Sequence, residues 1–421
     1  MAEVTSQSQQ AAATPVYILR GHAAPIHALY IFSQNLRLVS GDADGWIVVW
    51  DIVTKRPVTV WKAHEGAILE AKGFAVEGGG AEIYTHGRDH KLCVWKLRKE
   101  DEKFLDKTLP VDAAASNQQD KGTKPWLLHS LPVNALNFCA FSMTFIDKHT
   151  QKDIDNDSTR HQPKNNDILF AVPNALDSGG IDIFHLPSEL RLCTIRSDPT
   201  IKTGMVMSVE IFFSPSGDLY VTSAYEDGHV MAFVRRGPID PASFDLKHIS
   251  SHPWKWEKIY GSRPHSQPVL SIDVPPSRDC FFSSSADALI IKHPIPTHPT
   301  IGKNGEDLPL KTINTKHSGQ QGLRIRRDGK IFATAGWDSR VRVYSGKTMK
   351  ELAVLKWHKD GCYAVAFGEV DPVTEPASSD TAEGQSLSLA TVHSQRNLKV
   401  QQTHWLAVGS KDGKVSLWDI Y

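Results

Sequence analysis

The sequence predicts an all-β fold in which seven four-stranded blades form one closed ring. Three observations predict this ring. A motif recurs about every 40 residues. Within the motif, an aromatic residue follows an aspartate at a constant spacing. The chain also has one spare strand before the first copy and ends directly on the last copy, as ring closure requires.

The first two copies of the motif are the clearest. Residues 21–51 contain His22 near their start and Trp50 near their end. His64 lies 42 positions after His22, and Trp95 closes the second copy. In both copies the Trp lies six positions after an aspartate. This pattern is the signature of the WD40 repeat, the sequence unit of a propeller blade.

The motif residues should form a buried chain of hydrogen bonds in each blade. The Asp accepts from the His ring, the ring contacts a Ser or Thr hydroxyl, and the hydroxyl accepts from the Trp indole N–H. Each bond contributes on the order of 1 kcal/mol, whereas an unpaired buried partner costs about 1–3 kcal/mol. The predicted structural tetrads comprise His22, Ser40, Asp44 and Trp50, then His64, Thr85, Asp89 and Trp95, and finally His358, Asp412 and Trp418.

Weaker copies fill the middle of the chain. Three of them place Phe233, His293 and Tyr344 where the first two copies have Trp, and His317 precedes the last of these three. The third copy, at residues 168–184, is the poorest and has Ser178 at the Asp position. With these copies the count reaches seven, so we predict a seven-bladed WD40 β-propeller.

The ends of the chain should close the ring. Residues 16–19 are a spare strand that completes the last blade, and residues 1–14 form a disordered tail. The rest, 15–421, is a single propeller with loop insertions at about 96–124, 147–167 and 369–402. Their polar composition predicts loops, with only a short outer strand near 104–109.

Composition argues against several classes of function. Lys plus Arg and Asp plus Glu balance at 47 each, so no overall field attracts nucleic acid or an anionic membrane. The five cysteines are scattered without a C-x-x-C pair, which favours reduced thiols. No apolar run is long enough to span a membrane, and the N-terminus does not have the pattern of a signal peptide.

No enzyme chemistry is predicted. The Ser, His and Asp residues superficially resemble a hydrolase triad, but they recur from blade to blade, which favours a structural role. The sequence has neither a Gly-x-Ser-x-Gly motif nor a phosphate-binding loop. The repeat explains His22, His64, His317 and His358, and the other histidines lack ligand spacing, so we expect no catalytic residues, metal or cofactor.

Protein partners should bind beside the tetrads. The residue before each tetrad Asp should open on one face of the ring, and an exposed Trp337 there would be a strong anchor, although packing against the next blade is an equal alternative. Blade six also has a positive excess that could meet an acidic partner, or could simply project from an ordinary strand. The candidate partner-binding residues are Trp337, Arg88, Lys411, Glu226, Arg324, Arg326 and Arg327.

The chain resembles the fungal ASTRA-associated protein 1 family and, more distantly, animal G-protein β-subunit-like WD-repeat proteins. The resemblance rests on residues 17–22, 38–51, 357–367 and 409–421. It implies a non-catalytic scaffold subunit of the ASTRA complex in the nucleus, with a cytoplasmic pool as an alternative. The implied partners are a kinase-like scaffold, RuvB-like ATPases and telomere-maintenance cochaperone proteins. The implied processes are chromatin remodelling and maturation of PI3-kinase-related kinases.

Two rival functions would each require a sequence feature that this chain lacks. A substrate receptor of a cullin-type ubiquitin ligase usually has Arg two positions after Trp-Asp, where this chain has Val53. A heterotrimeric G-protein β subunit would need a long N-terminal heptad helix, for which residues 1–14 are too short.

Overall fold

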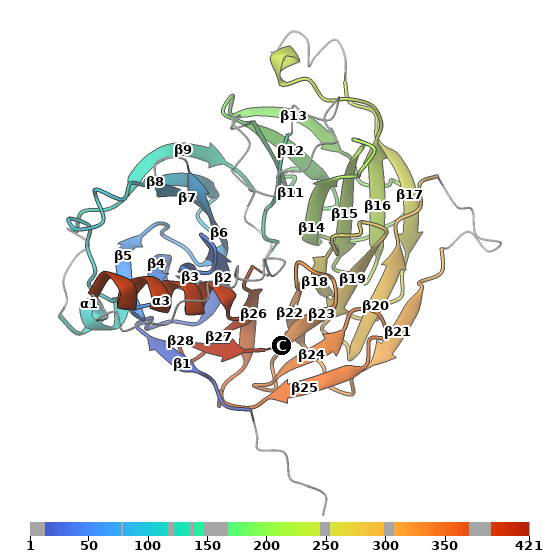
Figure 1. Ribbon diagram of the computed structural model, residues 1–421. Coiled ribbons are helices and arrows are strands. Elements are labelled where there is room, and N and C mark those ends of the chain that lie inside the picture. The colour runs from blue at the N-terminus through green and yellow to red at the C-terminus, as the bar shows by residue number, and fades with distance from the viewer. Residues whose placement is uncertain are drawn as a thin grey trace, which may run out of the picture.

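The computed structural model describes residues 13–76, 79–116, 122–134, 139–146, 167–244, 253–298, 307–369 and 389–420. Seven four-stranded antiparallel sheets surround a central axis like the blades of a propeller (Figure 1). The predicted fold class is therefore confirmed.

Each blade runs from a strand beside the axis to a strand at the rim. Blades 1 and 2 comprise β2 (Ile26–Phe32), β3 (Arg37–Asp42), β4 (Trp46–Asp51) and β5 (Arg56–Lys62), then β6 (Ile68–Val76), β7 (Gly80–Gly87), β8 (Lys91–Leu97) and β9 (Trp126–Pro132). Blades 3 and 4 comprise β10 (Ser142–Phe145), β11 (Ile168–Pro173), β12 (Ile181–Leu186) and β13 (Leu190–Ile195), then β14 (Val206–Phe213), β15 (Leu219–Tyr225), β16 (Val230–Arg235) and β17 (Glu257–Ser262). A short 3-10 helix, η1 (Pro241–Ser243), precedes β17.

The remaining blades follow the same order. Blade 5 comprises β18 (Val269–Asp273), β19 (Cys280–Ser285), β20 (Leu289–Pro294) and β21 (Lys311–Asn314). Blade 6 comprises β22 (Gln320–Ile325), β23 (Ile331–Gly336), β24 (Val341–Ser345) and β25 (Glu351–Leu355). Blade 7 comprises β26 (Cys362–Phe367), β27 (Trp405–Ser410), β28 (Lys414–Asp419) and β1 (Tyr17–Arg20).

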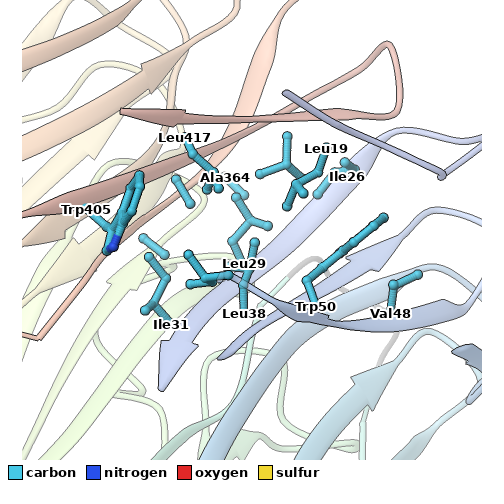
Figure 2. Close-up of a cluster of buried hydrophobic side chains, with 14 of the residues drawn as sticks. Leu19, Ile26, Leu29, Ile31, Leu38, Val48, Trp50, Ala364, Trp405 and Leu417 are labelled. Carbon is cyan, nitrogen blue, oxygen red and sulfur yellow. The ribbon is translucent and has the colours of Figure 1, made fainter. Parts of the chain in front are cut away.

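The N-terminal strand closes the ring, as predicted. β1 pairs antiparallel with β28, from Tyr17 opposite Leu417 to Arg20 opposite Lys414. Leu19 is buried in an apolar cluster that blades 7 and 1 share (Figure 2). The two ends of the chain therefore build one blade.

The first insertion differs from the prediction. Residues 104–109 do not form a strand, because the rim strand of blade 2 is β9. The segment crosses to blade 1 instead: the Val60 N–H donates to the Asp106 carbonyl at 2.8 Å, and Leu109 packs near Trp50. A helix, α1 (Pro110–Ser116), follows.

The third insertion also differs from a simple loop. Its C-terminal part forms a helix, α3 (Leu389–Gln402), in which no Pro or Gly interrupts the turns. Val400 is buried beside Trp405, whose indole N–H donates to the Val400 carbonyl at 2.9 Å. Asn35 of blade 1 donates to the carbonyls of Glu369 and Gln401, so it anchors both ends of this insertion.

Other expectations fall outside the described residues. These are the N-terminal tail up to residue 12, the second insertion at 147–166, and residues 370–388. In the part of the chain that the structure describes, no helix is long and apolar enough to cross a membrane.

Candidate interaction face

Blade 2 contains a complete tetrad of the predicted residues. The Trp95 indole N–H donates to Thr85 Oγ1 at 2.9 Å, and His64 Nε2 lies 2.8 Å from the same oxygen. His64 Nδ1 lies 2.8 Å from Asp89 Oδ1. Burial tends to raise the pKa of Asp89, but hydrogen bonding and charge from His64 outweigh it, so this pKa lies below its ordinary value. The carboxylate therefore stays ionised and fixes the ring.

Blade 1 corrects the prediction of Asp44. His22 Nδ1 contacts Asp42 Oδ2 at 2.7 Å, whereas Asp44 is exposed and contributes only a backbone N–H to Asp42. In blade 2 the position of Asp42 is held by Gly87, where a Cβ would come within 2.3 Å of the His64 ring. A side chain at this position therefore reaches the histidine directly. The rest of the tetrad is as predicted: His22 Nε2 and the Trp50 N–H both contact Ser40 Oγ, at 2.7 and 2.8 Å.

In blade 7 the tetrad hydroxyl lies on the third strand, β28, whereas in blades 1 and 2 it lies on the second strand. His358 Nε2 and the Trp418 N–H each lie 2.8 Å from Ser416 Oγ, and Ser416 pairs with Val408, which replaces the usual Ser or Thr. Asp412 lies 3.7 Å from His358 Nδ1, which is an ion-pair distance. The three predicted residues are therefore brought together, but through a serine that the sequence reasoning missed.

Blade 5 has a tetrad whose histidine the sequence reasoning also missed. His265 contacts Ser283 Oγ at 2.8 Å and Asp287 at 3.1 Å, and His293 takes the place of Trp, 2.8 Å from Ser283. Burial holds the pKa of His293 well below its ordinary value, so this ring is neutral. His265 precedes Ser283 by 18 positions, as His22 precedes Ser40, and this spacing could have identified it.

Blades 3, 4 and 6 replace the tetrad with other polar pairs. In blade 6, His317 lies 3.5 Å from the motif Asp338, as the repeat predicts, but it is half-exposed, and Thr334 donates to Gln320 Oε1 at 2.7 Å instead of contacting a histidine. In blade 4, Ser223 donates to the Tyr225 hydroxyl. In blade 3, Asp177 accepts two backbone N–H groups in the turn where Ser178 was expected to act.

Four of the predicted partner-binding residues lie on one face. In six blades, the first residue of the turn between the second and third strands donates its backbone N–H to a carbonyl. This carbonyl belongs to the residue just before the innermost strand of the same blade, and the distance is 2.9–3.0 Å. These equivalent turn residues are Ala43, Arg88, Glu226, Ala286, Trp337 and Lys411. We call the end of the ring that they occupy the loop face. Arg88, Glu226, Trp337 and Lys411 are all exposed there.

Trp337 is the most prominent apolar residue among these turn positions. Its side chain is 47% exposed, and its indole N–H donates to Gln321 Oε1 at 2.8 Å. The ring covers Gly319, where a Cβ would come within 2.1 Å of it, and Gly319 has a φ of +75°. Trp337 is thus held rigidly with half of its surface open to solvent.

The three arginines of blade 6 that are candidates for partner binding each pair with a carboxylate. Arg324 points into the central channel and donates to Glu70 at 2.9 Å. Arg326 is buried against Asp328, and Arg327 forms an ion pair with Glu369 at 3.0 Å. Carboxylates from the same turn or from other blades therefore neutralise this charge.

A ring of bulged residues surrounds the loop-face end of the central channel. In six innermost strands the pairing register shifts after the first residue, leaving one residue outside the ladder. These strands begin at the loop face, so the bulges lie just inside it. The residues are His27, Leu69, Met207, Leu270, Gln321 and Tyr363, and we call them the mouth ring. With residues beneath them, they line a cavity of about 90 Å³ to which all seven blades contribute.

The described residues include no group of three or more His, Cys, Asp or Glu side chains arranged to hold a metal ion. The face consists of rigid turns, one exposed aromatic ring and a polar channel. This arrangement suits the binding of protein segments.

Comparison with known proteins identifies the relatives of the chain. The family model described as ASTRA-associated protein 1 matches residues 15–418. The chain is 66% identical to ASTRA-associated protein 1 of Penicillium rubens, with both chains covered in full. It is 60% identical to that of Aspergillus flavus, over 99% of this chain and 100% of the relative. The protein of the same name from Schizosaccharomyces pombe is 33% identical, over 87% of this chain and 97% of the relative.

Proposed function

Because the chain belongs to the ASTRA-associated protein 1 family, we propose that it is a non-catalytic scaffold subunit of the ASTRA complex. Its loop face would bind other large subunits. The observation that supports this most is Trp337, a half-exposed aromatic side chain held by Gln321 on a closed ring. A rigid anchor of this kind contributes contact area with little loss of conformational entropy on binding.

We further propose the identity of the partners. They are a kinase-like scaffold, RuvB-like ATPases and telomere-maintenance cochaperone proteins, and the assembly acts in chromatin remodelling and in maturation of PI3-kinase-related kinases. The site of action is the nucleus. These finer proposals rest on the family resemblance, and the propeller supplies a surface that suits them.

Affinity purification from gently prepared nuclear extract tests the proposal. Mass spectrometry should identify the scaffold, ATPase and cochaperone chains with the tagged protein. Recovery of a cullin and its adaptor instead would replace the proposal with the ubiquitin-ligase alternative. Absence of the tagged protein from the nuclear fraction would contradict the proposed location.

A matched pair of variants tests the face. Trp337→Ala should reduce recovery of at least one partner about tenfold or more, as loss of an aromatic anchor does at other interfaces. Trp126→Ala is the control, because Trp126 is a 64% exposed tryptophan on the rim strand β9. If both folded variants reduced partner recovery equally, the loop face would be excluded as the binding surface.

A further inference from the structure

The mouth ring has two chemically different sides. Leu69, Met207 and Leu270 supply aliphatic side chains from blades 2, 4 and 5. On the opposite side of the ring, His27 and Tyr363 stack with their centroids 5.4 Å apart and their planes within 4°. Gln321 is the remaining member of the mouth ring, and it accepts the indole N–H of Trp337 at the loop face. A side chain entering from the loop face would therefore meet aliphatic and aromatic surface first.

Carboxylates lie directly below this apolar surface. Glu70 follows Leu69 in β6, is 5% exposed, and accepts a hydrogen bond from Arg324. Glu210 in β14 lines the same cavity and accepts from the Ser142 hydroxyl at 2.5 Å. Asp273 lies three residues past the bulge of β18, as Glu210 does in β14, and accepts from the backbone N–H groups of Val274 and Ile325.

Two cations, Arg324 and Lys72, share the described part of the channel with these three carboxylates. Arg324 interacts with all three of them. Lys72 lies three residues past the bulge of β6, in the same layer as Arg324, and its ammonium is 5.5 Å from the ring centroid of Phe141, which lines the cavity. Burial and the nearby charge of Glu210 raise the pKa of Asp273 to about 7, despite the opposing effect of Arg324. Because this shift favours the neutral form of Asp273, the three carboxylates exceed the two cations, Arg324 and Lys72, by at most one negative charge.

The size of the cavity limits the group that can enter. A volume of about 90 Å³ is well below the roughly 300–1,000 Å³ of pockets that hold a drug-sized ligand. This space suits the head group of one side chain and excludes a nucleotide or a folded segment.

We propose that the mouth ring is a receptor for one basic side chain, lysine or arginine, carried by a partner protein. Its methylene stem would pack against Leu69, Met207 and Leu270, as the stems of basic residues commonly pack on apolar surface. Its cationic head would lie near Glu210, where a charge-assisted hydrogen bond can form, and the His27–Tyr363 stack would line the entrance. The inference concerns this chain alone and does not depend on which assembly the protein joins.

The full-length chain labelled with [methyl-¹³C]methionine provides a direct test. Met207 belongs to the mouth ring, and Met231, buried in the blade core, is an internal reference. The probes are an alanine pentapeptide with a central arginine and the same peptide with citrulline, which preserves the shape of arginine but is neutral. The arginine peptide should shift the Met207 methyl resonance saturably, with a dissociation constant on the order of 1 mM. The citrulline peptide should bind at least about tenfold more weakly.

Two variants locate the binding charge. Glu210→Gln should weaken binding of the arginine peptide about tenfold. Glu65→Gln is the control, because Glu65 is an exposed carboxylate in a turn of the same face and should leave binding unchanged. The inference is overturned if citrulline and arginine peptides shift Met207 equally, or if Met207 does not respond to either. That comparison uses the wild-type chain, so it decides the question even if Glu210→Gln does not fold. A failure to recover ASTRA subunits would leave this measurement unaffected.

Discussion

The two halves of the ring hold neighbouring blades together in different ways. From blade 7 through blade 1 to blade 2, the innermost strands pack through apolar contacts beside the axis. Gly409 lies against Ile26 and Gly41 against Ile68, and a Cβ at either glycine would come within 2.6 Å of the isoleucine. These three blades also contain all the tetrads that have Trp.

From blade 3 to blade 6, hydroxyl groups link the innermost strands. Ser142 accepts the backbone N–H of Ile211 at 3.1 Å, and Ser208 accepts that of Ile272 at 3.2 Å. Ser271 likewise accepts from Leu323 at 3.2 Å. The blades with the most degenerate motifs therefore gain polar contacts beside the axis. The comparison shows that one ring can be stabilised either within its blades or between them.

The largest expected effect comes from opening the apolar half at its seam. Deleting residues 1–19 removes most of β1 and the buried Leu19 from blade 7. Loss of a buried leucine alone costs about 2–5 kcal/mol, and the strand's hydrogen bonds add to that cost. The thermal unfolding midpoint should fall by about 5 °C or more. Deleting only residues 1–12 is the control, and similar midpoints for the two deletions would contradict the closure.

A smaller effect is expected from the tetrad of blade 1. Asp42→Ala leaves His22 without its carboxylate and removes the acceptor for two backbone N–H groups, those of Asp44 and Trp46. The cost should be about 3 kcal/mol in the free energy of unfolding. Asp44→Ala should cost less than about 0.5 kcal/mol, because this side chain is exposed. Urea unfolding of both variants measures the difference, and the reverse order would restore Asp44 to the tetrad.

The same residues show how far sequence could predict this molecule. The constant Asp-to-Trp spacing and the spare strand were sufficient for the seven blades and their closure, because both are properties of the repeat. The sequence could not decide between Asp42 and Asp44, because both carboxylates lie in one short turn and only the geometry shows which one reaches His22. His265 was predictable, because it precedes Ser283 by the same 18 positions that separate His22 from Ser40.

The candidate site was predictable only in part. The turn position of Trp337 follows from the repeat, so its face could be predicted. The mouth ring could not, because β-bulges leave no periodic signal and bring together residues from six blades. Nor could the pairing of Arg324 with Glu70, which lie 254 positions apart. The positive excess of blade 6 is visible in the sequence, but the carboxylate partners of Arg324, Arg326 and Arg327 are visible only in the structure.

The smallest expected effect concerns the polar half of the ring. Ser208→Ala removes the acceptor of the Ile272 N–H between blades 4 and 5. An unpaired buried N–H costs about 1–3 kcal/mol, and we expect the lower end of this range because water in the polar channel can replace part of the bond. Ser216→Ala, in an exposed turn of the same blade, is the control and should change the free energy of unfolding by less than about 0.5 kcal/mol. If hydrogen exchange of the Ile272 amide is equally slow in wild type and Ser208→Ala, the hydroxyl does not link these blades, and apolar packing holds both halves of the ring.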